Sequence, residues 1–233
     1  MQELYIGIDL AWGENNSSGF CVLTPVDGKL KILNIKLLQN IESIVTEIVK
    51  YKNRKIYIGI DAPLLIPNEA GNRDVEKNFN KDFAKNKIAM FPVSRKLLRK
   101  EKQLFRGEVL YQKLQDLGFM SSFDNDKVVF EVYPHSTIAV CFNQNNILEY
   151  KRKKGRSIEY IKQQLEVYKK YLLSVIKDHD LLQNKISDLR TKQLKDYEDC
   201  LDAITSAFTL YYCRHNKSKI YKCETKEIFI TPI

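Results

Sequence analysis

Hydrophobic residues along the chain fall into short unbroken runs and into longer stretches with helical spacing. The unbroken runs predict strands, and their apolar character on both faces is typical of strands buried within a sheet. The first three predicted strands span residues 4–10, 19–24 and 30–37, and two more span 56–60 and 128–133. A short strand is also expected near the end of the chain, at 227–231.

The connections between these runs predict how the strands pair. Asp27 and Gly28 separate the second and third runs, and this dipeptide favours a tight hairpin in which both residues have positive φ. The first three strands are therefore expected to form an antiparallel meander. Asn40 can cap a helix over 41–53, which would return the next strand parallel to the first. The fold class that follows is α/β: a mixed five-stranded sheet of three antiparallel strands, then parallel strands, flanked by helices.

The segment 64–127 has helical and not strand-like hydrophobic spacing. It is interpreted as a helical insertion within a single domain that covers the whole chain. A polar helix is predicted over 71–85, and a longer one is predicted over 94–117. Two further helices are expected, one after the cap Ser157 and one over 192–213.

Composition narrows the class of protein. With 44% hydrophobic and 29% charged residues, the chain is expected to be globular and soluble. The N-terminus enters a strand without a secretory leader, and no apolar run reaches the ~20 residues that span a bilayer. Five scattered cysteines without a Cys-x-x-Cys pair are typical of a reducing compartment, so we expect a cytoplasmic protein without a structural zinc site.

The net charge of +9 indicates affinity for polyanions, of which nucleic acid is the commonest in a cytosol. The alternative is a lysine- and asparagine-rich proteome in which many proteins carry this balance. Net charge bears on association and not on fold, so the charge alone does not choose between them.

Four aspartates occupy positions where an acidic side chain is energetically unfavourable. Asp9 and Asp61 each end an apolar strand, so in neighbouring parallel strands both would emerge at the edge where open α/β folds bind ligands. Asp199 and Asp202 are three apart on a predicted helix, roughly 60° apart around its axis. The small Ala203 beside them would let that helix approach the sheet. Each signal also has an ordinary explanation, a cap or turn at a strand end and a solvated helix face.

Carboxylates brought together repel each other, so such a cluster needs a counter-charge at neutral pH. Hard divalent cations with oxygen ligands supply it, and Mg²⁺ or Mn²⁺ is the expected cofactor, held by Asp9, Asp61, Asp199 and Asp202. Two such ions about 3.5–4 Å apart can activate water and stabilise the leaving oxygen of a phosphodiester. The order of the four acids therefore predicts metal-assisted phosphate chemistry.

Glu131 lies inside an apolar strand and points to the face opposite Phe130 and Val132. One interpretation makes it a fifth catalytic acid, either a metal ligand or a base. The other makes it a buried acid neutralised by an arginine or by a helix N-terminus.

The blocks that carry these acids resemble one protein family. Residues 7–12, 58–64, 130–134 and 199–203 are similar to the domain-of-unknown-function 429 family, which is described as predicted RNase H-like nucleases. The resemblance extends over residues 5–208 and implies an RNase H-like fold and nuclease activity.

The Asp-x-x-Asp-Ala block also resembles RuvC-type Holliday-junction resolvases, in which a first-strand Asp, an acid ending the fourth strand and two helix acids bind the metals. This resemblance implies the same ligand role for Asp9, Asp61, Asp199 and Asp202. The chain departs from that family by having Asp and not Glu at position 61, which shortens the reach to a metal. The extra block around Glu131 and the helical insertion are further departures.

Basic residues of the insertion are candidates for substrate binding. Arg73 and Arg95 match polar positions of the family, and Lys96 and Arg99 extend the basic start of the predicted helix. We expect these side chains to hold a phosphate backbone, with Arg95 closest to the helix N-terminus and therefore to the anion. The alternative for them is a solvated helical face.

Three functions follow from the sequence. The first is a metal-dependent nuclease that hydrolyses phosphodiester bonds of nucleic acid by a two-metal mechanism. The second is a phosphotransferase or ATPase of the actin and sugar-kinase superfamily, although Pro63 offers no N–H where that superfamily needs a glycine-rich phosphate loop. The third is a nucleic-acid- or protein-binding module whose acids do no chemistry.

Overall fold

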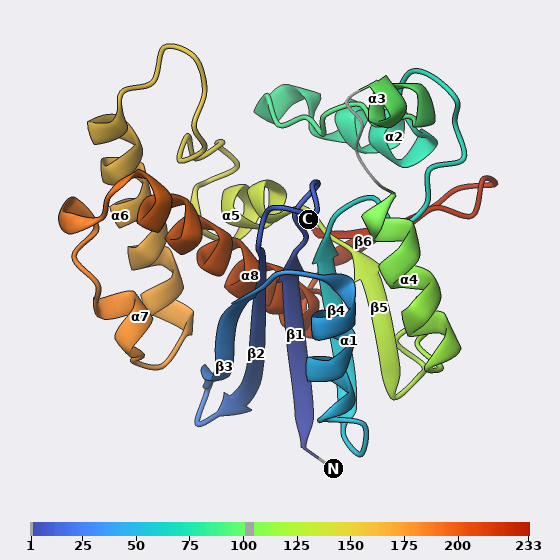
Figure 1. Ribbon diagram of the computed structural model, residues 1–233, viewed down its shortest axis with the longest axis horizontal. Coiled ribbons are helices and arrows are strands. Elements are labelled where there is room, and N and C mark those ends of the chain that lie inside the picture. The colour runs from blue at the N-terminus through green and yellow to red at the C-terminus, as the bar shows by residue number, and fades with distance from the viewer. Residues whose placement is uncertain (1, 101–104) are drawn as a thin grey trace.

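The structure, a computed structural model, describes residues 2–100 and 105–233. Its strands are β1 (Glu3–Asp9), β2 (Ser18–Val26), β3 (Lys29–Leu38), β4 (Lys55–Asp61), β5 (Lys127–Glu131), β6 (Ser218–Lys222) and β7 (Ile228–Pro232). They form one sheet in the order β3-β2-β1-β4-β5-β7-β6 (Figure 1). The first three strands are antiparallel, and β4, β5 and β7 continue the sheet parallel to β1.

The α/β class with a mixed sheet is confirmed, but the sheet has seven strands where five were predicted. The expected tail strand is β7, which pairs with β5 on one side and with β6 on the other. β6 has only one buried residue, Tyr221, so its sequence lacks the apolar run that marks an inner strand.

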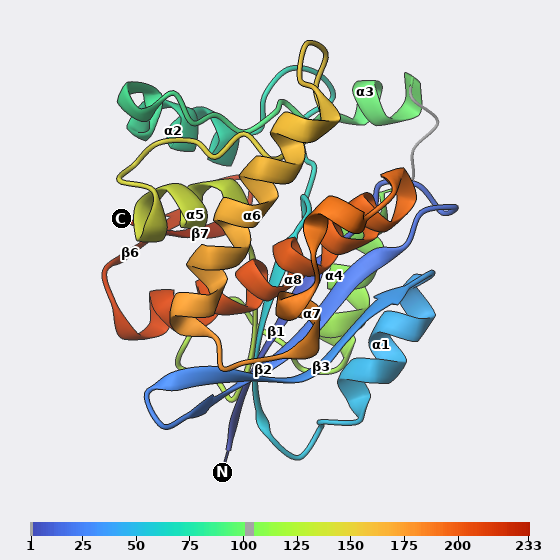
Figure 2. The same cartoon turned by 90° about the vertical axis from the view of Figure 1, so that its left-hand side faces the viewer.

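Helices cover both faces of the sheet. They are α1 (Ile41–Val49), α2 (Asp74–Asp82), α3 (Arg95–Lys100), α4 (Arg106–Asp116), α5 (Pro134–Phe142), α6 (Ile158–Val175), α7 (Asp180–Gln183) and α8 (Thr191–His215), with short 3-10 helices η1 (Ala84–Asn86) and η2 (Ile186–Asp188). One hydrophobic core lies between the sheet and α1 and α4, and another lies between the sheet and α6 and α8 (Figure 2). None of these described helices is both long and apolar enough to cross a membrane.

Local turn and cap signals predicted the element ends well. Asp27 and Gly28 have φ values of 49° and 76°, as the hairpin requires. Asn40 caps α1 by accepting a hydrogen bond of 2.8 Å from the backbone N–H of Ser43, and Ser157 caps α6.

The segment between β4 and β5 is helical, but the single helix predicted over 94–117 is wrong. The structure has two helices there, α3 and α4, and Phe105 before α4 has a non-helical backbone with ψ 54°. α4 packs beside α1 on the sheet as the crossover that parallel strands require, whereas α2 and α3 stand beyond the sheet edge (Figure 1). The helix α5 was not predicted: Pro134, expected only to break β5, occupies its first turn.

α8 approaches the sheet closely because small residues line both sides of the contact. A methyl group on Gly7 of β1 would lie 1.8 Å from the carbonyl oxygen of Ala203, and one on Gly19 of β2 would lie 2.2 Å from that of Asp199. Only glycine allows this approach at the two sheet positions. It brings the acids of α8 to the ends of the central strands.

Candidate functional site

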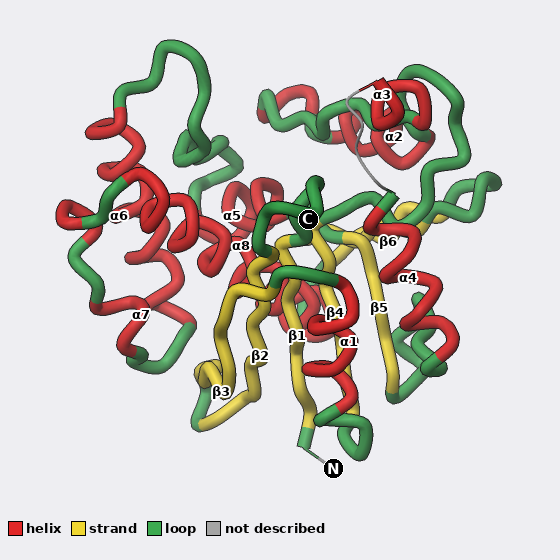
Figure 3. The backbone as a smooth tube through the Cα atoms, viewed as in Figure 1, coloured by secondary structure: helices red, strands yellow, loops and turns green. Residues whose placement is uncertain are grey.

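The aspartates that end β1 and β4 are direct neighbours. In the parallel pairing of these strands Asp9 is the register partner of Asp61, as Gly7 is of Gly59. Residues two apart on a strand share a face, and both glycines face α8, so both carboxylates lie on the face that α8 covers. The strands end there in loops (Figure 3).

These loops and their neighbours enclose a cleft of about 1090 Å³. Asp9 and Asp61 line it, together with Glu131 and Asp199. Asp202 is fully buried and lies outside this lining. Of the four aspartates predicted to converge, three therefore face the cleft and one lies in the interior of the protein.

Asp202 is held by an internal network. The hydroxyl groups of Tyr150 and Tyr168 donate to its Oδ1 at 2.7 and 3.0 Å, and the ammonium of Lys151 donates to its Oδ2. The same ammonium lies 3.1 Å from Oε1 of Glu198. Lys151 thus supplies, from the loop before α6, the positive charge that the cluster of acids requires.

The pKa values of the aspartates in this cluster are shifted in different directions. Burial raises the pKa of Asp9 well above its usual range, against the attraction of Lys151 and with the repulsion of Asp202. Burial raises the pKa of Asp61 to about 7 for the same reasons. Burial also acts to raise the pKa of Asp202, but the ammonium of Lys151 and the hydrogen bond from Tyr150 outweigh it and hold that pKa below its usual value. Asp202 is therefore the ionised partner of Lys151. The ionisation of Asp9 and of Asp61 is disfavoured by burial and by the neighbouring negative charges.

Within the described residues, no hydrogen bond or ion pair engages the carboxylate of Asp9 or of Asp61. Asp199, by contrast, is paired with Lys195 one turn earlier on α8, and that lysine also lies 3.0 Å from Glu198. Asp9 and Asp61 at the strand ends, like Asp196 on α8, are thus acids of the cleft whose oxygens remain available to a ligand.

Glu131 does not join the aspartates. It is paired in register with Ile60, so its side chain lies on the face of the sheet away from α8. Its carboxylate accepts two hydrogen bonds from Arg73, at 2.6 and 2.9 Å, and one of 3.0 Å from the backbone N–H of Leu64. Arg73 also pairs with Glu76 at 2.6 Å and is itself buried. These contacts are those of a buried acid neutralised by an arginine, the second of the two interpretations of Glu131.

The other predicted phosphate-binding residues lie away from the acids. Arg95 pairs with Glu108 at 2.9 Å, and Arg99 forms an exposed pair of 2.7 Å with Glu69. Lys96 is exposed on α3. In the described part of the chain, none of the three belongs to the lining of the cleft. The insertion faces the cleft through its loop around Phe91 instead.

Comparison with known proteins places the sequence blocks in one family. Residues 7–222 match the model of a family described as "Protein of unknown function (DUF429)". The chain belongs to the DUF429 family. Comparisons with curated proteins and with solved structures found no match.

Apart from Arg73, the cations of this DUF429 cleft were not predicted as site residues. They come from the loop before α6, from the start of α8 and from the segment after η1, and they are Lys87, Lys151, Lys153, Arg156, Lys192 and Lys195. The loop 151–156 is visibly basic in the sequence, and Lys195 precedes Asp199 by four residues, the spacing of a helical ion pair. Of these two signals, only the spacing of Lys195 and Asp199 points to an acid of the site.

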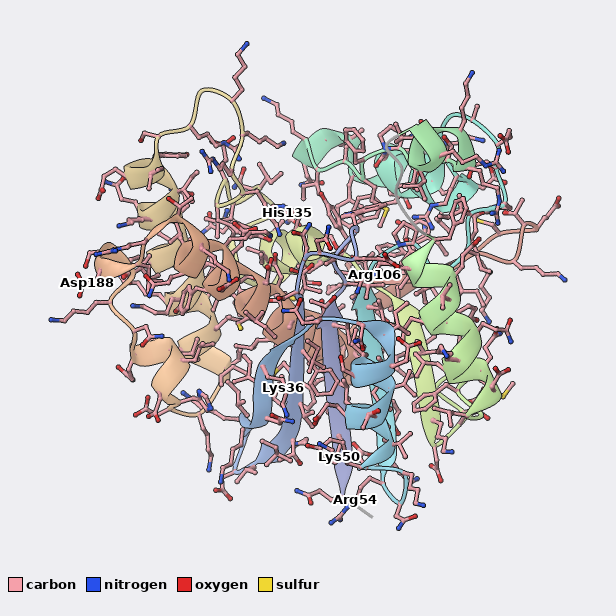
Figure 4. The ribbon with its side chains drawn as sticks, viewed as in Figure 1. Lys36, Lys50, Arg54, Arg106, His135 and Asp188 are labelled. Carbon is pink, nitrogen blue, oxygen red and sulfur yellow. The ribbon has the colours of Figure 1, made fainter. Side chains whose placement is uncertain are left out.

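His135 also belongs to the DUF429 site, and the sequence did not indicate it as a site residue. It lines the cleft from the first turn of α5 (Figure 4). Its ring lies 4.8 Å from that of Tyr150. Its buried Nδ1 has no hydrogen-bond partner among the described residues. Burial lowers the pKa of His135 to about 3, so the imidazole is neutral at neutral pH.

The fit of a divalent cation to this site is partial. The oxygen donors of Asp9 and Asp61 suit Mg²⁺ or Mn²⁺, and both are available. Among the described residues, no three His, Cys, Asp or Glu side chains are grouped so that they could hold a metal ion. Lys151 pairs with Asp202, and Lys195 pairs with Asp199. The arrangement thus leaves the carboxylates of Asp9 and Asp61 unpaired, whereas Asp199 and Asp202 are each paired with a lysine.

Proposed function

We propose that this DUF429 protein is a nuclease that hydrolyses phosphodiester bonds of nucleic acid and requires Mg²⁺ or Mn²⁺. The observation that carries the proposal is the pair Asp9 and Asp61, neighbours in register at the ends of parallel strands. Both are half-buried, have no partner among the described residues and are open to a cleft lined by cations. Folding does not bring two unpaired carboxylates together for stability, since each raises the cost of ionising the other.

The metals of the proposed two-metal mechanism would be held by Asp9 and Asp61 first, and by Asp199 and Asp202 once Lys195 and Lys151 have moved to the substrate. Bound there, a divalent cation would polarise the phosphodiester and lower the pKa of an attacking water. Tyr150 and Tyr168 keep the carboxylate of Asp202 in place throughout, because both donate to the oxygen that Lys151 does not bind.

The lysines of the cleft give it affinity for a phosphate backbone. Lys153 and Lys192 are exposed on its wall, so they can neutralise phosphates on either side of the scissile bond. The order of β1 to β5, three antiparallel strands followed by two parallel ones, supports the RNase H-like arrangement that the family resemblance implies. The five free cysteines support a cytoplasmic location, where thiols stay reduced.

The proposal is tested by incubating the purified chain with single-stranded, duplex, hybrid and branched nucleic acids in Mg²⁺, Mn²⁺ or EDTA. Cleavage is expected only with a divalent cation, and Asp9→Asn should reduce it by about 10²-fold or more. Asp116→Asn, on the exposed surface of α4, is the matched control and should cleave as the wild type does. A chain that binds Mn²⁺ but cuts none of these substrates would refute the nuclease proposal.

A further inference from the structure

Two aromatic rings are exposed on the walls of the cleft. Phe91 is 77% exposed, the highest value among the described large hydrophobic residues, and Trp12 is 44% exposed. Both line the cleft that contains Asp9 and Asp61. Trp12 follows β1, whereas Phe91 belongs to the segment between η1 and α3, so the rings reach the cleft from different parts of the chain. A single exposed hydrophobic residue is ordinary, but two exposed rings in one cleft indicate a binding surface.

The same cleft carries exposed lysines from three segments. Lys87 ends η1, Lys153 lies in the loop before α6, and Lys192 lies in the first turn of α8. All three are exposed, and no ion pair between described residues engages them. Figure 1 shows α2 and α3 of the insertion and the loop that leads into α6 on opposite sides above the strand ends. The cleft therefore offers positive charge and aromatic faces together.

This combination matches one class of ligand. An unpaired base exposes a π-face that can stack on an aromatic side chain, whereas a duplex keeps its base faces inside the stack. We infer that the cleft binds single-stranded nucleic acid, with bases stacked on Phe91 and Trp12 and phosphates neutralised by Lys87, Lys153 and Lys192. The inference rests on the proposed nuclease function, because it names the form of substrate that reaches the acids.

The single tryptophan of the chain makes the inference directly measurable. The full chain in EDTA is titrated with oligothymidylate and oligouridylate of about 12 nucleotides, within the site size of such grooves, and with a duplex of the same length. Both single strands should quench the fluorescence of Trp12. For three phosphate contacts, the logarithm of the association constant should fall with the logarithm of salt concentration with a slope of about −2. The comparison of the two oligonucleotides shows whether the cleft prefers DNA or RNA.

Two variants test the rings and the lysines separately. Phe91→Ala should weaken single-strand binding about tenfold, the effect of losing one stacked base. Lys153→Ala should make the salt slope less steep by about 0.7. Their controls are Met120→Ala, an exposed hydrophobic residue outside the cleft, and Arg54→Ala, at the opposite end of the molecule (Figure 4); both should bind as the wild type does.

The outcomes separate this inference from the proposed chemistry. Binding is measured in EDTA, where no metal-dependent cleavage takes place, so a failure of cleavage in Mg²⁺ or Mn²⁺ leaves the binding result intact. Duplex binding as tight as single-strand binding, unchanged Trp12 fluorescence at saturation, or full affinity in Phe91→Ala would each overturn the inference.

Discussion

Arg73 donates two hydrogen bonds to Glu131, from Nη2 to Oε1 at 2.6 Å and from Nη1 to Oε2 at 2.9 Å, in the interior of the protein. Arg73 stands at the start of α2, and Glu131 ends β5. The pair therefore joins the helical insertion to the central sheet beside the cleft.

Replacing Arg73 by Met should destabilise the fold by about 3–5 kcal/mol, because Glu131 and Glu76 would remain buried without their counter-charge. Urea denaturation followed by circular dichroism measures this loss. Arg99→Met removes an exposed pair with Glu69 and should cost less than about 1 kcal/mol. Equal stability of the two variants would contradict a structural role for the Arg73–Glu131 pair.

Asp61→Asn should stabilise the metal-free chain. The pKa of Asp61 is raised from 3.8 to about 7 in the folded state, so its ionisation opposes folding as pH rises from 4 to 7. The gain should approach about 4 kcal/mol at pH 8 in EDTA, should shrink as pH falls below 7 and should vanish near pH 4. Urea denaturation across this range measures it, with Asp116→Asn as the control. Excess Mn²⁺ should stabilise the wild type more than Asp61→Asn, and an equal effect on both would argue against Asp61 as a ligand.

Lys151→Met should bind Mn²⁺ about tenfold more tightly than the wild type, because the ammonium that now neutralises Asp202 competes with a divalent cation for the same acids. Isothermal titration calorimetry gives the two affinities, and far-UV circular dichroism verifies that the variant is folded. Lys154→Met, an exposed neighbour outside the cleft lining, should leave the affinity unchanged. Weaker binding by Lys151→Met would show that the lysine supports the metal site and does not compete with it.

His135 should make the fold sensitive to mild acid. Its pKa is lowered to about 3 in the folded state, so below the unfolded value of 6.5 the unfolded chain takes up a proton that the folded chain does not. Stability should therefore fall as pH drops from 7 to 5, and His135→Asn should remove this part of the fall. The acids with raised pKa act in the opposite direction, so the test is the difference between wild type and variant. His215→Asn, at the exposed end of α8, should retain the wild-type slope.

The sequence determined the central part of the fold because its signals there are local. Unbroken apolar runs identify β1 and β4, and the intervening helix makes them parallel neighbours. Since the carboxyl ends of such strands meet at one edge, the proximity of Asp9 and Asp61 follows from the sequence alone. The Asp27-Gly28 hairpin was predictable for the same reason, as its turn chemistry is contained in two residues.

Elements with weak local signals depended on their tertiary surroundings. β6 has a single buried residue and forms only because β7 offers it an edge to pair with. The helical periodicity over 94–117 corresponds to two helices, α3 and α4, which pack in different hydrophobic clusters. Hydrophobic spacing does not predict such a change of chain direction.

That clustered acids need a positive charge follows from the sequence, but the source of that charge is visible only in the folded chain. Lys151 reaches Asp202 from 51 residues away, and Arg73 reaches Glu131 from 58 residues away. Neither pair has a spacing that a pattern could reveal, because each forms between segments that meet only when the chain folds around the sheet. The acids of the site can therefore be identified from the sequence. Their basic partners, which leave some acids free for a ligand and neutralise others, are identified only from tertiary contacts.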